Sequence, residues 1–410
     1  MRRILWLLGV MAIFLSTAVR CEDAAVAPPG EQSPRAGNPI DIVFLEKAYP
    51  ESEPLSLLQS NPADNGIAGA KLAAQEINIT GNLIGRQFAL NVEKLPMDAD
   101  VATRARQILA RGPVAIVANL DPGDLQAVAS LPEAKQALIL DARTIDDRLR
   151  QEDCRTNVFH ILPSRAMRTD AIAQFLAAKR WRRWFLLRGP GANNEAYATD
   201  VRRSAARFGG KVVEERSYDY QPGARRVDTG YQQIQSQMPL ATQSVPAYDV
   251  LFVADESGLF GDYLPYNTYE ARPIVGTQGL VATAWHASFQ EYSALQMQHR
   301  FKLFAHREMT ERDYAAWLAL RIVGEAVVRS GKSEPRELSA FLRSDQFEVA
   351  GFKGQALTFR SWDQQLRQPV LLAQALMVVS LSPQEGFLHQ KFLTDTLGFD
   401  EPETKCVLAP

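Results

Sequence analysis

The sequence predicts an α/β protein built from two consecutive sets of parallel strands, each covered by helices on both faces. Three observations support this prediction. Short apolar runs alternate with segments whose apolar residues recur at helical spacing. The alternation restarts near Ala166, and 410 residues are enough for two or three domains. Strands that alternate with helices form parallel sheets, because a helix returns the chain to the start of the next strand.

The first set begins with a short apolar strand, and a helix with a buried face follows it. Ile67, Ala70, Leu72, Ala73 and Ile77 recur at the spacing of one helix face. We expect strands over 40–45, 88–92, 114–118 and 137–140, and helices over 65–77, 101–110 and 125–134.

The second set repeats this order of strands and helices. Two further helices and strand pairs follow it. We expect helices over 166–178, 194–208, 231–237 and 259–266, and strands over 184–187, 211–215, 250–253 and 273–275. After them the sequence predicts helices over 311–329 and 335–342, then strand pairs around a turn over 357–379.

The first residues are typical of a secretory signal peptide. Arg2 and Arg3 precede an apolar run over 4–15, and small residues follow up to Ala18. The run is shorter than the ~20 apolar residues that span a bilayer. We expect a signal peptide over 1–18, a flexible leader over 19–38, and an exported protein that does not span the membrane. Lipidation of Cys21 remains an alternative, although Arg20 stands where a lipid-attachment motif has a small residue.

Composition and motifs argue against several classes of function. The formal net charge is −2, which gives no electrostatic reason to expect a nucleic-acid partner. The five histidines lack metal-ligand spacing, and no G-x-S-x-G nucleophile motif occurs. We therefore expect neither enzymatic activity nor a cofactor, and we leave a metal ligand open. Cys154 and Cys406 form a disulfide in an oxidising compartment, or they remain two thiols.

Several segments carry a resemblance to a known family. In order along the chain they are Gly66 to Asn78, Gly81 to Gly85, Asp98 to Leu109, Val158 to Ser164, Tyr314 to Val328 and Gly351 to Phe359. In sequence and spacing they resemble the type I periplasmic binding proteins, the group that includes the Leu/Ile/Val receptors. The fold that this implies has two Rossmann-like lobes with parallel sheets, joined by a three-strand hinge.

The resemblance also implies domains and partners. One lobe would comprise 39–162 and 285–347, the other 163–284 and 348–395, with a C-terminal tail over 396–410. The chain would be a monomeric periplasmic receptor that delivers a small molecule or ion to an inner-membrane ABC permease. An accessory or sensor protein that uses the same fold to bind a protein partner is the alternative.

The later part of the chain resembles a narrower branch of this family. The similar segments are Phe352 to Gly354, Leu366 to Pro369 and Thr396 to Pro402. This branch accompanies alcohol dehydrogenase systems that depend on pyrroloquinoline quinone (PQQ). The resemblance implies a role in periplasmic alcohol oxidation.

Polar residues at predicted strand ends are the candidate ligand-binding residues, because open α/β sheets bind ligands there. They are Asp121, Gly123, Asp124, Asp141, Thr144, Glu195, Tyr197 and Asp255. Asp121 and Asp124 flank a predicted helix start, where they would repel a ligand carboxylate. We expect an acidic pocket that favours a cationic or hydroxyl-rich ligand over free amino acids. The alternative is that these acids only cap helices, as the pattern from Thr144 to Asp147 also suggests.

Overall fold

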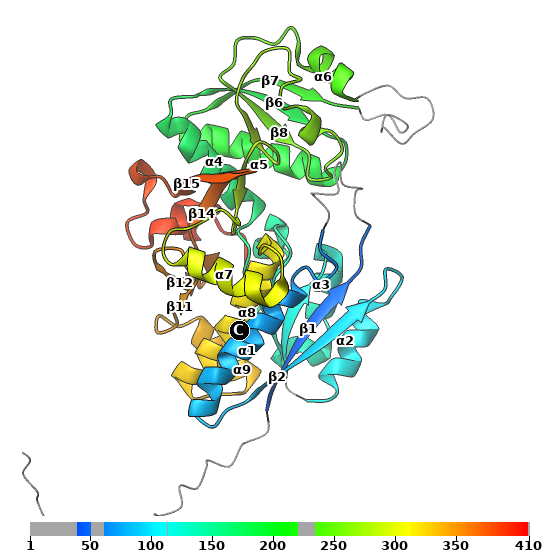
Figure 1. The fold of residues 1–410 in the computed structure, drawn as a ribbon, viewed down its shortest axis with the longest axis vertical. Coiled ribbons are helices and arrows are strands. Elements are labelled where there is room, and N and C mark those ends of the chain that lie inside the picture. The colour runs from blue at the N-terminus through cyan, green and yellow to red at the C-terminus, as the bar shows by residue number, and fades with distance from the viewer. Residues whose placement is uncertain (1–38, 51–60, 113, 220–233, 409–410) are drawn as a thin grey trace, which may run out of the picture. The chain divides into compact units, whose positions relative to one another are not determined.

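The computed structural model describes residues 39–50, 61–112, 114–219 and 234–408. The expected signal peptide and leader, together with Cys21, lie outside these residues. Two separate β-sheets form the framework, one from the first part of the chain (blue to cyan in Figure 1) and one mainly from the middle (green). None of the helices in the described part is long and apolar enough to cross a bilayer.

The first sheet is fully parallel and has the strand order β2-β1-β3-β4-β5. Its strands are β1 (Ile40–Lys47), β2 (Phe88–Leu95), β3 (Ala115–Asn119), β4 (Leu138–Asp141) and β5 (Val158–His160). The helices between them are α1 (Ile67–Leu83), α2 (Val101–Leu109) and α3 (Pro122–Ala129).

Both faces of this sheet are buried. In β1, Ile42 and Phe44 join a core cluster with residues of α1, while Val43 and Leu45 join another with residues of α2 and α3. Side chains alternate across a strand, so an uninterrupted apolar run supplies both cores.

The second sheet has the order β15-β14-β10-β9-β8-β6-β7, and β14 alone runs antiparallel to the other strands. Its strands are β6 (Arg183–Arg188), β7 (Lys211–Ser217), β8 (Val250–Ala254), β9 (Ile274–Gly276), β10 (Leu280–Thr283), β14 (Val370–Gln374) and β15 (Met377–Ser382). The associated helices are α4 (Arg165–Ala178), α5 (Ala192–Phe208) and α6 (Ile234–Thr242). The strand pair expected near the end of the chain thus completes this sheet.

Two predicted helices are shorter in the structure, two run longer, α1 to Leu83 and α6 to Thr242, and one helix was not predicted. The helix expected over 125–134 ends at Ala129 and is followed by a 3-10 turn, Pro132–Gln136, because Pro132 has no N–H to continue it. The helix expected over 259–266 is a 3-10 turn of three residues, Gly261–Tyr263. The unpredicted helix is α7 (Ala294–Ala305), which has no side-chain N-cap and buries only four residues.

Helix α8 (Glu311–Ser330) returns to the first sheet and packs against α1. Both contact points require glycine: a Cβ on Gly69 would lie 1.9 Å from the Asp313 carbonyl oxygen, and one on Gly324 would lie 2.7 Å from Ile77. A capping box between Thr310 and Asp313 fixes where α8 begins. Helix α9 (Pro335–Leu342) follows with the predicted bounds.

The chain passes between the two sheets after β5, after β10 and before β14, and side chains tie these three connections together. Gln365 donates from Nε2 to the Leu162 carbonyl at 3.0 Å, and Gln368 donates to that of Ile161 at 2.5 Å. Lys353 donates from Nζ to the carbonyl oxygens of Ala284 and Pro369. These three side chains lie in the segments that flank the strands of a small sheet, β11 (Val349–Ala350), β12 (Ala356–Phe359) and β13 (Leu366–Arg367).

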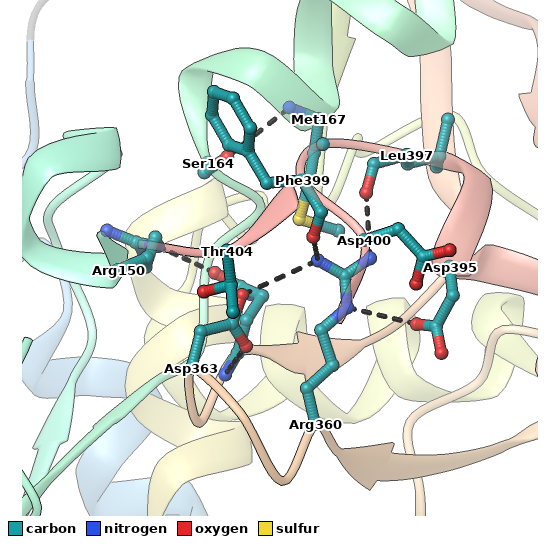
Figure 2. A network of polar contacts seen from close by, with 12 residues as sticks. Arg150, Ser164, Met167, Arg360, Asp363, Asp395, Leu397, Phe399, Asp400 and Thr404 are labelled. Carbon is teal, nitrogen blue, oxygen red and sulfur yellow. Dashed lines mark hydrogen bonds and ion pairs between the residues drawn. The ribbon is translucent and has the colours of Figure 1, made fainter. Parts of the chain in front are cut away.

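The C-terminal tail is bound to both parts of the fold. Arg360 contacts the Asp395 carboxylate at 2.9 Å and the Leu397 carbonyl at 2.7 Å (Figure 2). Asp170 in α4 accepts from the Gly398 N–H. A disulfide then joins Cys406 to Cys154, which follows β4, with 5.6 Å between their Cα atoms. The tail therefore contacts α4 beside the second sheet and is covalently attached beside the first.

Candidate functional site

A pocket of about 500 Å³ is lined by residues that follow strands of both sheets. Charged and polar residues are the majority of the lining, and Pro122, Ile145, Val281 and Ala282 add apolar surface. It comprises Asp121, Pro122, Arg143, Thr144, Ile145, Asp146, Arg165, Arg168, Asn193, Tyr197, Asp255, Glu256, Gly276, Thr277, Gln278, Val281, Ala282, Thr283, Glu311 and Arg312. Parallel strands place their carboxyl ends at one edge of a sheet, so both sheets contribute the loops that follow their strands.

Half of the eight candidate residues line this pocket, namely Asp121, Thr144, Tyr197 and Asp255. The other four, Gly123, Asp124, Asp141 and Glu195, are not part of its lining. The structure thus brings one candidate or more to the pocket from each of the four predicted strand ends.

Asp121 and Asp124 differ in what they do. Asp121 occupies the N-cap position of α3 but makes no side-chain cap hydrogen bond; its Oδ1 accepts from Nε of Arg143 at 2.7 Å. Asp124 accepts from the Tyr49 hydroxyl at 2.7 Å and pairs with Lys47 at 3.1 Å. Asp121 therefore positions an arginine in the pocket, and Asp124 stabilises the loop behind it.

Asp141 is a fully buried structural residue. Its carboxylate accepts from the Thr144 N–H at 2.9 Å and lies 2.8 Å from Nδ1 of His160. Burial opposes its ionisation, but His160, Arg150 and Thr144 hold the pKa of Asp141 below its usual range. The capping pattern expected from Thr144 to Asp147 does not form: the Thr144 hydroxyl binds Asp141, and Asp146 caps the following 3-10 turn (Asp147–Arg150).

The second-sheet candidates also have defined partners. Glu195 lies at the surface, where it pairs with Arg202 at 2.7 Å and Arg188 at 3.2 Å. Asp255 lines the pocket, but its Oδ2 accepts from the N–H groups of Phe260 and Gly261, both at 2.8 Å. These bonds shape the loop after β8.

The expectation of an acidic pocket was incomplete, because Arg143, Arg165, Arg168 and Arg312 line the pocket beside its five carboxylates. The sequence interpretation counted the acids at strand ends and overlooked the arginines beside them. A usable signal was present: Arg143 follows β4 by two residues, and two arginines occupy the first turn of α4 after the first connection.

The arginines are held in ion pairs. Arg165 binds Glu256 through two nitrogens, Nε at 2.7 Å and Nη2 at 2.9 Å. Burial alone would lower the pKa of Arg165, but the pairing with Glu256, together with the charges of Asp147 and Asp146, outweighs burial and raises it. Arg168 donates from Nη2 to Glu311 at 2.9 Å. The pocket therefore presents guanidinium groups whose orientations are set before any ligand arrives.

A family model described as "periplasmic binding protein" matches residues 53–376, most of the chain. The chain belongs to this family. Members serve as substrate-binding components of transporters, and the type I form has the two-sheet architecture described above. Comparison with curated protein sequences gave no match.

Solved structures with the same fold include three binding proteins whose names give different ligands or ligand classes. A branched-chain amino acid ABC transporter ligand-binding protein from Burkholderia xenovorans is 16% identical, with a TM-score of 0.70 over 90% of this chain and 99% of that one. The leucine-, isoleucine-, valine-, threonine- and alanine-binding protein from Brucella ovis is 14% identical, with a TM-score of 0.65 over 91% and 100%. A solute-binding protein from R. palustris in complex with benzoate is 12% identical, with a TM-score of 0.63 over 90% and 100%. Identities this low establish the fold alone.

The pocket of this periplasmic binding protein is lined from both sheets. Charged groups and hydrogen-bonding side chains come from both sheets, so a ligand in the pocket would touch both. Within the described ranges, no group of three or more His, Cys, Asp or Glu residues is placed to hold a metal ion.

Proposed function

We propose that this chain is the periplasmic receptor of an ABC transporter and binds a small solute in the pocket between its two sheets. The observation that carries the proposal is the lining of that pocket, which Asp121 and Arg143 enter from the first sheet and Tyr197 and Glu256 from the second. A ligand that contacts both sides stabilises the arrangement in which they are close together.

The connections between the sheets support hinge motion. Three chain segments link the two parts, and hinge closure around a ligand is the common movement of such receptors. We infer lobes of 39–162 with 285–347 and 163–284 with 348–395, and a tail of 396–410. The receptor would act as a monomer that docks on an inner-membrane permease.

Export is part of this proposal. The charged, apolar and small residues over 1–18 have the order of a secretory signal, and the family acts in the periplasm. We also propose, on the likeness of the segments 352–354, 366–369 and 396–402, that the transporter serves PQQ-dependent alcohol oxidation. Deletion of the gene should then impair growth on alcohols and leave growth on sugars unchanged.

A binding screen tests the receptor function. The purified mature chain is heated with amino acids, organic acids, alcohols, polyols and metal ions, and binding to the native state raises the melting temperature. Asn193→Trp places a large side chain at an exposed lining position and should abolish the shift. Asn82→Trp, at an exposed position of α1 outside the pocket lining, is the control. A chain that no solute stabilises would instead favour a sensor or accessory protein.

A further inference from the structure

Arg165 has a hydrogen-bonding group left over for a ligand. The residue is 4% exposed, and Glu256 occupies its Nε and Nη2. No described residue accepts from the remaining nitrogen, Nη1, although Arg165 lines the pocket. A guanidinium carries five N–H donors in a rigid plane, so the pairing with Glu256 fixes the direction of those that remain.

Arg143 supplies a second set of donors from the opposite side. Asp121 accepts from its Nε, and the guanidinium lies over the Tyr49 ring, 4.7 Å from the ring centroid. Both terminal nitrogens lack an acceptor among the described residues, and Arg143 also lines the pocket. The ion pair and the ring contact hold the side chain without using these donors.

Tyr197 contributes a hydroxyl to the same space. Its side chain is 3% exposed and packs on Phe252, yet no residue in the described part of the chain bonds its hydroxyl. Burial and the charge of Glu256 raise the pKa of Tyr197, so the hydroxyl keeps its proton. The residue is buried, but its hydroxyl is not among the fully enclosed polar atoms, so a ligand in the pocket that Tyr197 lines could supply its partner.

The lining carboxylates, in contrast, are already engaged. Each of the five accepts at least one hydrogen bond from the chain itself; they are Asp121, Asp146, Asp255, Glu256 and Glu311. The polar groups of Arg143, Arg165 and Tyr197 that have no partner in the described chain are therefore hydrogen-bond donors. Donors require acceptors, and among small solutes the strongest partner of a guanidinium is a carboxylate.

We infer, building on the proposed receptor function, that the ligand is a small organic acid whose carboxylate and further acceptor oxygens are bound by Arg143, Arg165 and Tyr197. Because Arg143 comes from the first sheet and the other two from the second, a dicarboxylate or hydroxycarboxylate can bridge both sides. This class differs from the cationic or hydroxyl-rich ligand that the acids alone had suggested. It also differs from leucine, isoleucine and valine, each of which carries one carboxylate and no further acceptor oxygen.

Matched ligands test the inference by calorimetry on the full mature chain. The panel pairs mono-, di- and hydroxycarboxylates of two to six carbons with their amides, and adds glycerol and putrescine. We expect at least one acid to bind and its amide to bind at least tenfold more weakly, because charge-assisted hydrogen bonds are lost. Tighter binding of an amide, a polyol or a diamine than of every acid would overturn the inference and leave the receptor function standing.

Variants locate the binding. Tyr197→Phe and Arg143→Gln should each weaken the acid about tenfold to a hundredfold. Tyr248→Phe is the matched control for the first, since that hydroxyl is also buried without a described partner but lies outside the pocket lining. Arg148→Gln, at an exposed ion pair, is the control for the second. Unchanged affinity in both test variants overturns the assignment, and a chain that binds nothing in the panel or in the wider screen overturns the receptor function too.

Discussion

Arg168 and Glu311 form an ion pair that links α4, beside the second sheet, to the first residue of α8, beside the first sheet. Glu311 also accepts from the Thr283 hydroxyl at 2.8 Å, and Arg168 also donates to the Ala282 carbonyl at 3.0 Å. Both charged residues line the pocket. This ion pair therefore lies in the pocket, joins a helix beside each sheet, and contacts the second segment that links the sheets.

Removal of the Glu311 charge should destabilise the protein. In Glu311→Gln, the half-buried Arg168 keeps its charge and loses its anionic partner, so we expect the free energy of unfolding to fall by about 2 kcal/mol. Urea denaturation measures the change. Glu325→Gln on the same helix is the control. A denaturation midpoint equal to that of the unmodified protein would show that the pair contributes nothing to stability.

Lys353 should make stability depend on pH in the alkaline range. Burial lowers its pKa from 10.5 to about 7, despite the opposing charge of Glu311. Between pH 7 and 10.5 the unfolded chain therefore binds a proton that the folded chain has released. The free energy of unfolding contributed by this group rises with pH across that window, by up to about 1.4 kcal/mol per unit.

Lys353→Met removes this titration. Denaturation at several pH values from 7 to 10 should show a flatter dependence in the variant, whereas Lys302→Met, at an exposed site, should retain the slope. Parallel curves for Lys353→Met and the unmodified protein would contradict the lowered pKa. The variant should also be less stable overall at high pH, because the carbonyls of Ala284 and Pro369 lose their donor.

Asp200 is expected to have the opposite pH dependence. Burial, together with the neighbouring Asp147 carboxylate, raises its pKa from 3.8 to about 9. The folded chain therefore keeps a proton that the unfolded chain releases above pH 4, and the stability contributed by this group is lost as pH rises toward 9. Asp200→Asn mimics the protonated form.

We expect Asp200→Asn to raise the melting temperature by about 2–4 °C at pH 8, the shift that about 1 kcal/mol gives in a protein of this size. The gain should shrink toward pH 4. Asp345→Asn, at an exposed site, should change neither value. An equal effect of Asp200→Asn at pH 4 and pH 8 would argue against the raised pKa of Asp200.

The disulfide between Cys154 and Cys406 should stabilise the fold by restricting the unfolded chain. Cys406→Ser opens a loop that spans 252 residues, and we expect a loss of about 2–5 kcal/mol. Calorimetric melting of the variant measures it, with Cys21→Ser as the control. Recovery of both thiols free in non-reducing peptide maps of the unmodified protein would refute the bridge itself.

Much of the fold followed from apolar periodicity. Helix α9 has the predicted bounds, and the two parallel sets appear as two sheets. Periodicity reports which residues are buried but not how strands pair, so it did not assign β14 to a sheet, and only the resemblance placed 348–395 in the second lobe. It also missed α7, where exposed Leu295 and Leu303 blur the spacing of its buried face.

The candidate site was predicted less well, because strand ends indicate position but not side-chain direction. Asp121 and Tyr197 face the pocket, whereas Asp141 and Glu195 bind neighbours elsewhere. The ion pair between Arg165 and Glu256 spans 91 residues of sequence. No local sequence pattern reveals such a pair. Without it, the sequence shows no positively charged partner for the carboxylates at the strand ends.

The disulfide also has a consequence for biosynthesis. A ribosome makes the chain from its N-terminus, so Cys154 is incorporated 252 residues before Cys406. The bridge can close only when synthesis is nearly finished. Any product that stops short of Cys406 retains an unpaired thiol at Cys154, and a thiol-reactive label on that residue would distinguish truncated molecules from complete ones.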